Sequence, residues 1–409
     1  MKRFLLLILL AACLAGCDNS SDDFFGTPSN PVSAPQAVND AYNGLGNAPL
    51  SVALAQGVLV NDTVPAPVTA FQNPSAQGAT VAVNADGSFT YTPVNGFQGA
   101  DTFTYTTTNS SGQSTATVTL NVANTARFVN NTAAPGNPGT FAAPFSSLAE
   151  AQANSVPGDT IFVFRGNGNP YTGITLQNNQ RLIGEGSGLV VARQDVLAQG
   201  TVVPQGPFPI IGGTVIMADG CTVQGLHIGG FAGDGITSNG VDGTIVGNEF
   251  ADITNPGNVG NQAMDFDLTS GAWTIQGNNF VDIQAGAIVV SGALLSGTAT
   301  YVFTDNIANN TGAMVFFGAA GTSQIRAQVS RNSIVGAVAV DSFSFVAGDQ
   351  ATLCLDLEGN STDQMYSFGN SATSTLNVEQ FASLNSLNNG TGNIVTGTIT
   401  EVANGFCNF

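Results

Sequence analysis

Asp265 and Asp267 form the carboxylate pair whose spacing best suits acid–base chemistry. They stand in the segment Met264-Asp265-Phe266-Asp267, in which apolar and acidic residues alternate. On a β-strand this alternation buries Met264 and Phe266 and turns both carboxylates outward, about 6.6 Å apart. That separation lies near the low end of the range for the two carboxylates of an inverting glycoside hydrolase. The other interpretation is a solvated or calcium-holding pair.

His227, the single histidine, and two aromatic residues are the other candidates for a site. His227 stands between Leu226 and Ile228, and no carboxylate or serine partner is evident in the sequence. This context favours an outward or hydrogen-bonded strand residue over a general base. Trp273, the only tryptophan, and Tyr301 could stack on a sugar ring, and packing inside the protein or at its rim explains them equally well.

The charge balance restricts the partners. The chain carries 8 Lys and Arg against 27 Asp and Glu among 409 residues, a formal net charge of −19. The basic footprint that phosphates need is missing, so we expect no nucleic-acid partner, and a polyanion would need a bridging divalent cation. A hydrophobic fraction of 43% indicates a folded chain. Small, polar and β-branched residues replace the usual helix formers, which predicts an all-β protein.

The first 17 residues have the features of an export signal. The basic residues Lys2 and Arg3 precede an apolar run that is too short to span a bilayer, and small residues follow. The last four of these residues, Leu14-Ala15-Gly16-Cys17, resemble the bacterial lipobox, which implies lipidation of Cys17 and attachment to a membrane. Residues 18–35 have the composition of a flexible tether. We therefore expect an exported lipoprotein of the bacterial cell envelope, anchored at the outer membrane or cell surface.

Three cysteines follow Cys17. In an oxidising compartment Cys354 and Cys407 could form a disulfide that fixes the C-terminus. None of the three has a Cys or His neighbour at metal-ligand spacing, so no zinc site is expected and the identity of any metal stays unknown. Cys221 lies in an apolar run, which is typical of a small core residue.

Residues 36–123 alternate apolar and polar positions between turn signals, which predicts a β-sandwich. The Asp-Gly pair at 86–87 precedes the stretch SFTYT and is a strong hairpin signal; GVLVND at 57–62, DTFTY at 101–105 and ATVTLNV at 116–122 complete the pattern. These motifs resemble the bacterial Ig-like or cadherin-like domains of extracellular adhesins, which implies a spacer or interaction module. In such a domain Asp62, Asp86 and Asp101 could hold calcium, and solvated turn residues are the other interpretation.

A repeat follows in the second part of the chain. Five segments align on asparagines spaced by 30, 28, 26 and 28 residues: Asn248, Asn278, Asn306, Asn332 and Asn360. Three positions before them stand Ile245, Ile275, Phe303, Val329 and Leu357, with Val223 in an earlier segment. One such coil cannot bury its own apolar side chains, whereas stacked coils form interior columns. Asparagine tolerates left-handed backbone and can bond its copies above and below, so we expect a structural column; a glycan-binding row is the alternative.

A second interior column is predicted at Ile236, Met264, Ile288, Met314, Val338 and Met365. Residues 144–151 predict a short amphipathic helix, which a Pro-Gly-Asp turn and a strand at 160–164 follow. With RLIGEG at 181–186 this segment resembles the entry into right-handed β-helices of the pectin-lyase-like superfamily. The predicted fold is therefore all-β, with an Ig-like β-sandwich followed by a right-handed parallel β-helix over residues 128–409.

The resemblance to that superfamily implies polysaccharide cleavage in many of its members. Elimination in pectate-lyase relatives uses calcium, an arginine or lysine base and a basic groove, whereas the mature chain has six scattered arginines and no lysine. The leading hypothesis is a non-catalytic, lipid-anchored envelope protein that binds a glycan or another cell surface without a cofactor. A polysaccharide-degrading enzyme that uses Asp265 and Asp267, with calcium as its possible cofactor, is the alternative. A purely structural envelope component is the third hypothesis.

Overall fold

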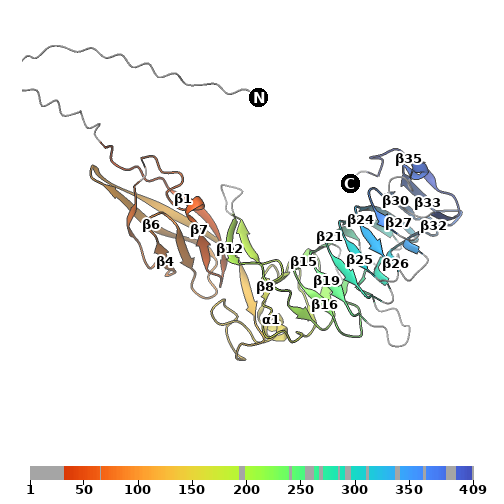
Figure 1. Cartoon of the computed structure of the whole chain (residues 1–409), viewed down its shortest axis with the longest axis horizontal. Coiled ribbons are helices and arrows are strands. Elements are labelled where there is room, and N and C mark those ends of the chain that lie inside the picture. Colours follow the sequence, from red (N-terminus) through yellow and green to blue (C-terminus); the bar gives the residue numbers. More distant parts are fainter. Residues whose placement is uncertain are drawn as a thin grey trace, which may run out of the picture.

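The computed structural model describes residues 32–407, apart from 65, 193–198, 239–241, 254–261, 267–269, 284–285, 291–295, 310–312, 337–340, 363–364 and 384–392. Regular structure in the described chain is almost entirely β-strand, in agreement with the predicted all-β class. The molecule is elongated and bent, and a first β domain continues into a long stack of strands (Figure 1).

The first domain is a two-layered sandwich. One layer has the strand order β2-β5-β4, and β3, β6 and β7 form the other, with β1 beside β7. Phe89, Tyr91, Phe103 and Tyr105 are at most 2% exposed and fill the space between the layers. The hairpin predicted at 86–87 joins β4 to β5, and Gly87 adopts φ +87°, which suits glycine. The strands are β1 (Asp40–Gly46), β2 (Leu50–Val52), β3 (Val68–Phe71), β4 (Thr80–Val83), β5 (Phe89–Thr92), β6 (Gly99–Asn109) and β7 (Gly112–Val129), and a 3-10 helix η1 (Leu54–Gln56) follows β2.

Strand β7 belongs to both parts of the molecule. Residues 112–122 of β7 pair antiparallel with β6, residues 118–125 pair parallel with β1, and the last residues, from Ala126 to Val129, pair parallel with β8 (Thr160–Val163). The sequence predicts a domain boundary between residues 123 and 128, and β7 crosses this position without interruption. One sheet therefore runs from the first domain into the stack.

The stack consists of three parallel sheets, and from β13 to β33 each sheet gains one strand per coil. Sheet I continues from β7 and β8 through β10 (Arg181–Gly184), β15 (Cys221–Gln224), β18 (Gly243–Val246), β21 (Gly271–Gln276), β24 (Ser296–Thr304), β27 (Thr322–Ser330), β30 (Thr352–Asp356), β33 (Thr375–Glu379) and β35 (Thr400–Val402). Sheet II contains β13 (Ile210–Ile211), β16 (His227–Gly229), β19 (Glu249–Ala251), β22 (Asn279–Val281), β25 (Ile307–Asn309), β28 (Ser333–Val335) and β31 (Ser361–Thr362). Sheet III contains β9 (Ile174–Thr175), β14 (Val215–Met217), β17 (Ile236–Ser238), β20 (Met264–Asp265), β23 (Gly286–Val290), β26 (Ala313–Ala319), β29 (Asp341–Ala347), β32 (Met365–Asn370) and β34 (Asn393–Thr396).

The first predicted interior column lies in sheet I. Val223, Ile245, Ile275, Phe303 and Val329 are directly paired from one strand to the next, and all five are fully buried. The strand register thus confirms these five members, and Leu357, the remaining predicted member, is buried directly after β30. Stacking is what buries these side chains, because each one covers its neighbours in the coils above and below.

The second predicted column is correct for its first three members and wrong beyond them. The register in sheet III runs from Met264 to Ile288 and then to Val315, Phe343 and Tyr366, instead of Met314 and Met365. Apolar residues occupy neighbouring positions here, so alternation alone cannot choose between them. In the last coils the aromatic residues take the interior, and the rings of Phe343 and Tyr366 stack at 5.0 Å. Val338 lies outside the described residues.

A short helix, α1 (Leu148–Asn154), precedes β8 (Figure 1). It begins later than the predicted 144–151, because the Ser147 side chain accepts a hydrogen bond from Glu150 N and caps the helix start. Leu148 and Ala151 are buried in the core of the stack, so the helix covers the apolar columns at their first coil.

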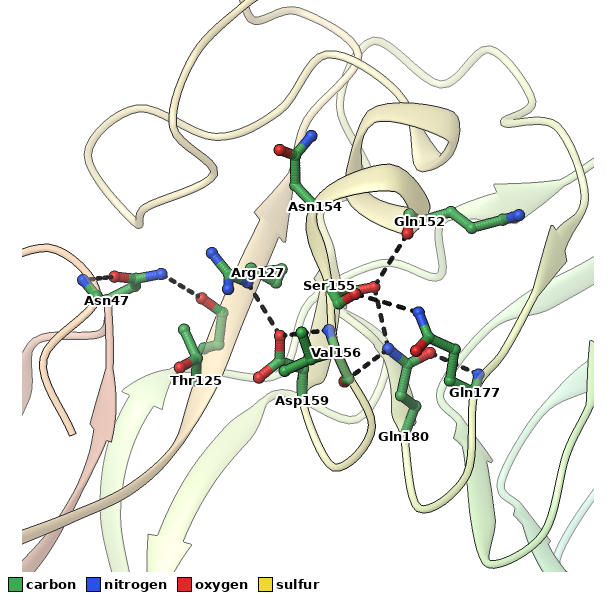
Figure 2. A network of polar contacts seen from close by, with 12 residues as sticks. Asn47, Thr125, Arg127, Gln152, Asn154, Ser155, Val156, Asp159, Gln177 and Gln180 are labelled. Atoms are coloured by element: carbon green, nitrogen blue, oxygen red, sulfur yellow. Dashed lines mark hydrogen bonds and ion pairs between the residues drawn. The ribbon is translucent and has the colours of Figure 1, made fainter. Parts of the chain in front are cut away.

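The residues after α1 are fixed to the first coil by a polar network (Figure 2). Arg127 Nε donates to Asp159 Oδ2 at 3.1 Å, and the same oxygen accepts Val156 N at 3.1 Å. Gln180 Nε2 donates to Ser155 Oγ at 3.0 Å and to the Val156 carbonyl at 2.9 Å. Asp159 is 1% exposed, so its charge is held inside the protein by these donors.

A second set of contacts joins the first domain to the stack. Asn47 Nδ2 donates to the Ala126 carbonyl in β7 at 3.2 Å, and the Asn47 carbonyl accepts Phe141 N at 3.1 Å. Asn47 Oδ1 also accepts Gly96 N at 2.7 Å. The antiparallel strands β11 (Leu189–Ala192) and β12 (Gln199–Val203) pack against β1 and β2 of the first domain. Together these elements enclose a buried apolar cluster of Ala48, Ala126, Phe128, Phe162, Ile183, Leu189 and Val203.

Candidate functional site

The five repeated asparagines form a continuous ladder inside the stack. Asn278 Oδ1 accepts hydrogen bonds from Asn248 N (3.0 Å) and Asn248 Nδ2 (3.1 Å), and Asn306 Oδ1 does the same for Asn278 at 2.9 and 3.0 Å. Asn332 and Asn360 continue the series with the same geometry. All five are at most 2% exposed. A glycan-binding row is therefore excluded for these side chains, and their place in the molecule is structural.

The left-handed backbone lies one residue before each asparagine, not at the asparagine as expected. Gly247, Gly277 and Gly359 have φ between +61° and +69°, and Asp305 and Arg331 occupy the same place with φ +59° and +55°. This shift leaves the asparagine side chain free to turn inward. In three of the five coils a glycine precedes the asparagine in the sequence, and this glycine could have predicted the left-handed backbone there.

Asp265, the first predicted catalytic residue, lies in β20 on the outer face of sheet III. Met264 and Phe266 on either side are fully buried, as the alternation predicts, and Asp265 is half-buried. Its register neighbours are Thr237 and Val289, which are not acidic. Asp267 lies outside the described residues, so the separation of the two carboxylates stays a prediction.

His227 has a carboxylate partner that the sequence analysis missed. His227 Nδ1 lies 2.9 Å from Glu249 Oε1, and the two residues are directly paired on β16 and β19 of sheet II. Glu249 stands one coil, 22 residues, after His227, and the period of the repeat was the signal that would have found it. The pair is partly exposed, and its register neighbours are Ile210 and Asn279.

Trp273 and Tyr301 cannot stack on a sugar, because both are only 1% exposed. Trp273 packs against Phe266 with ring centroids 4.7 Å apart, and its Nε1 donates to the Ser270 carbonyl. Tyr301 packs against Phe317. The packing interpretation is therefore correct for both residues.

The three aspartates considered for calcium are held by protein donors. Asp101 is 1% exposed and accepts Ser75 Oγ (2.6 Å), Tyr91 OH (2.8 Å) and two backbone N–H groups. Burial, together with this carboxylate, raises the pKa of Tyr91 well above its usual range. Asp62 accepts Val38 N and Tyr105 OH, and Asp86 accepts the side chain and N–H of Ser88, which lower its pKa.

No group of three or more His, Cys, Asp or Glu side chains that could hold a metal ion is found in the described part of the chain. Calcium therefore stays a prediction from the sequence.

Bridged by a disulfide, Cys354 and Cys407 fix the C-terminal segment to β30. Glu379 strengthens this attachment, since its carboxylate accepts Gly405 N at 2.8 Å and Cys407 N at 2.7 Å. Cys221 is a buried thiol whose pKa is raised by burial, and Cys17 lies outside the described residues.

The outer face of sheet I is a polar surface of the stack. Side chains at every second strand position point outward there, and threonine and glutamine dominate. From β24 to β33 the exposed or half-buried outer residues are Thr298, Thr300, Val302, Thr322, Gln324, Arg326, Gln328, Thr352, Asp356, Thr375 and Asn377. Cys354, which is paired with Arg326 and Asn377, is buried and carries the disulfide to Cys407. The face is hollowed between β24 and β27, where a depression of about 190 Å³ is lined by Thr298, Ala299, Thr300, Gln324 and Arg326.

Comparison with known proteins identifies the first domain only. Residues 33–124 match the family model of the bacterial cadherin-like domain, which confirms the resemblance seen in its motifs. Neither the curated proteins nor the solved structures contain a match to the chain. Among the described residues, no helix has the length and apolar character needed to cross a membrane.

Proposed function

We propose that this chain is a lipid-anchored, non-catalytic protein of the bacterial cell envelope that holds a glycan or another cell surface against its stack of coils. The observation that carries the proposal is the architecture. A cadherin-like domain continues, through one shared strand, into a long stack whose sheet I has a largely polar outer face. Such an arrangement suits a protein that presents a surface away from its anchor.

The proposed fold of the stack is a right-handed parallel β-helix of the pectin-lyase-like kind. From β13 to β33 each coil contributes one strand to each of three parallel sheets, and the asparagine ladder marks the same turn in five coils. The right-handed sense follows the strong preference of parallel strand connections. A crystal structure of the chain from residue 18 onward tests the handedness directly.

The proposed anchor is a lipid on Cys17, and residues 18–35 are the proposed tether. Metabolic labelling with a radioactive fatty acid should label the wild-type chain in its bacterial host and leave Cys17→Ser unlabelled. Inhibition of the lipoprotein signal peptidase should cause the uncleaved precursor to accumulate. Cleavage that is insensitive to this inhibitor would contradict the anchor.

The non-catalytic assignment is tested with a polysaccharide panel. The chain from residue 18 onward is incubated with neutral and acidic polysaccharides, with calcium and with a chelator, and reducing ends and unsaturated sugars are measured. We expect binding to at least one polysaccharide or to whole cells without product release. Product that disappears in Asp265→Asn and persists in Thr237→Val, its register neighbour on β17, would instead establish the enzyme hypothesis.

A further inference from the structure

The last described coil of the stack ends in two strand edges and an exposed member of the interior column. We infer that this end pairs with the same end of a second copy of the chain, around a two-fold axis, so that two molecules join tail to tail. The inference rests on the proposed function and deepens it, since it names the partner on the other cell surface as the chain itself.

The edges of β34 and β35 have no strand beside them in the described part of the chain. Strand β34 is the last of sheet III and pairs with β32, and β35 is the last of sheet I and pairs with β33. An unpaired edge presents backbone N–H and C=O groups to which another strand can be added. The described tail turns back from β35 toward β30, where Cys407 is bonded to Cys354, and it therefore leads away from these edges.

The interior column of sheet III is uncovered at this end. Phe317, Phe345 and Phe368 are paired in successive coils and are at most 1% exposed. Val395 is the next member of the column by register, yet it is 45% exposed. In the earlier coils the following coil buries each member. The end of a second copy would bury Val395 in the same way and remove its apolar surface from water.

The end of the stack is poor in charge. Residues 365–409 contain two charged side chains, Glu379 and Glu401. Glu379 is 5% exposed and accepts the N–H groups of Gly405 and Cys407, so Glu401 on β35 is the exposed one. Free strand edges usually carry charged residues or proline that prevent pairing, and β34 (Asn393–Thr396) contains neither. Depletion of charge is instead typical of the centre of a protein interface.

The partner that fits this end is a second copy. A two-fold axis beside β34 places the same strand of the other copy antiparallel to it, and both edges then have matching backbone groups. This contact also brings the two exposed Val395 side chains to one interface. No sequence other than that of the chain itself is needed to provide this complementarity.

The pairing closes with two copies. The first coil of the stack is covered by α1, and sheet I continues there into the first domain through β7, so that end offers no equivalent surface in the described chain. The first domain and the last coil lie at opposite ends of the molecule (Figure 1). Two chains joined at their last coils therefore direct their first domains, and with them the proposed anchors, away from each other, as a contact between two cells requires.

The pair is expected to be weak in solution. The end of a single coil offers an interface of small size, so we expect a Kd of about 100 μM. Each copy carries a formal charge of −19, and this like charge opposes association until salt screens it. Many anchored copies on two facing surfaces multiply such a weak contact.

Sedimentation velocity tests the inference with the chain from residue 18 onward, at concentrations below and above about 100 μM and at low and high salt. The same protein, attached to beads through its N-terminus, is tested for bead aggregation. The test variant is Val395→Lys, which places a charge at the uncovered column. The matched control is Val335→Lys on β28, a valine that is 57% exposed in an earlier coil. Thermal unfolding verifies that both variants are folded.

We expect the wild type to form dimers that salt strengthens and its beads to aggregate. Val395→Lys should weaken the dimer at least about tenfold and abolish bead aggregation, whereas Val335→Lys should change the Kd by less than about twofold. A wild type that stays monomeric on beads and in solution, a dimer that Val395→Lys leaves intact, assemblies larger than a dimer, or dissociation by salt would each overturn the inference.

The failure of this inference is distinguishable from that of the proposed function. Wild-type beads are also mixed with the polysaccharide panel and with cells that lack the chain. If the wild type binds one of these and does not pair with itself, the tail-to-tail contact fails and the proposed surface binding survives. If it binds neither these ligands nor itself, both fail.

Discussion

At the scale of single residues, the asparagine ladder requires that buried polar side chains keep their hydrogen-bond partners in the neighbouring coils. Asn306 is fully buried, its Oδ1 accepts two hydrogen bonds from Asn278, and its Nδ2 faces the carbonyls of Ile275 and Thr304 and the Oδ1 of Asn332. Removal of one side chain leaves buried donors and acceptors in two neighbouring coils without partners. Such groups are costly inside a protein.

Asn306→Ala is therefore expected to lower the free energy of unfolding by about 3 kcal/mol or more. Urea denaturation followed by circular dichroism measures the change. Asn309→Ala, in the same strand segment but exposed, is the control and should change stability by less than about 0.5 kcal/mol. Similar effects of the two substitutions would show that the ladder does not stabilise the stack.

A second prediction at this scale concerns pH. Asp305 accepts a two-pronged hydrogen bond from Arg331 at 2.7 Å, and this partner lowers its pKa to about 2. Because the folded pKa is depressed, the stabilisation is present above the unfolded pKa, near 4, and is lost as the pH falls through 2. The pair is largely exposed, so its contribution stays below about 1 kcal/mol.

Asp305→Asn should accordingly be less stable than wild type at pH 6, and this deficit should be much smaller at pH 2, where the Asp305 carboxyl of the folded wild type is about half protonated. Urea denaturation at the two pH values, at low and high salt, measures the difference, which salt should reduce. A deficit that persists unchanged at pH 2 would assign the effect to the left-handed backbone at this residue instead of to the ion pair.

At the scale of elements, the sequence predicted the repeating coils and missed several features that occur only once. The regular spacing of the asparagines identified the coils and the column through Ile245 and Ile275, since periodicity reports burial directly. It could not choose between Met314 and Val315, because both are apolar. The hairpin β11–β12 and the continuity of β7 have no counterpart in other coils, so no repeat revealed them.

The candidate site was predicted less well than the fold, for a related reason. Exposure of Trp273 depends on which way its strand faces, and the pairing of His227 with Glu249 depends on the register between coils. Both are properties of the stacked molecule. The polar face of sheet I was overlooked because its threonines are individually ordinary, and only the register turns them into rows.

The C-terminal end of the stack gives an element-scale prediction. The Cys354–Cys407 disulfide and the Glu379 carboxylate hold the last segment over β30 and β33. Cys354→Ser/Cys407→Ser should lower the unfolding free energy of the last coils by about 2–4 kcal/mol. Hydrogen exchange should show faster opening of β33 and β35 than of β15. In reductant, the wild type should exchange hydrogen as fast as the variant does, and the exchange of the variant itself should not change. If the exchange of the wild type is insensitive to reductant, the disulfide does not have this role.

At the scale of the whole molecule, strand β7 should make the two parts unfold and move together. Insertion of Gly-Ser-Gly between Asn124 and Thr125 is expected to separate one calorimetric transition into two and to broaden the distance distribution in small-angle scattering. The same insertion between Ser110 and Ser111, in the turn from β6 to β7, is the control and should leave both measurements unchanged. Coincident transitions in the β7 insertion would mean that the buried cluster around Phe128 alone couples the parts.

The shared strand also decides how the molecule responds to mechanical tension. In a chain with the proposed N-terminal anchor and the proposed attachment through the stack, tension along β7 would pass between the two parts, and the hydrogen bonds of a sheet lie across its strands. Tension in this direction loads many bonds at once in shear, whereas tension across the strands would open them one after another. The junction between the two parts is thereby reinforced against tension along β7.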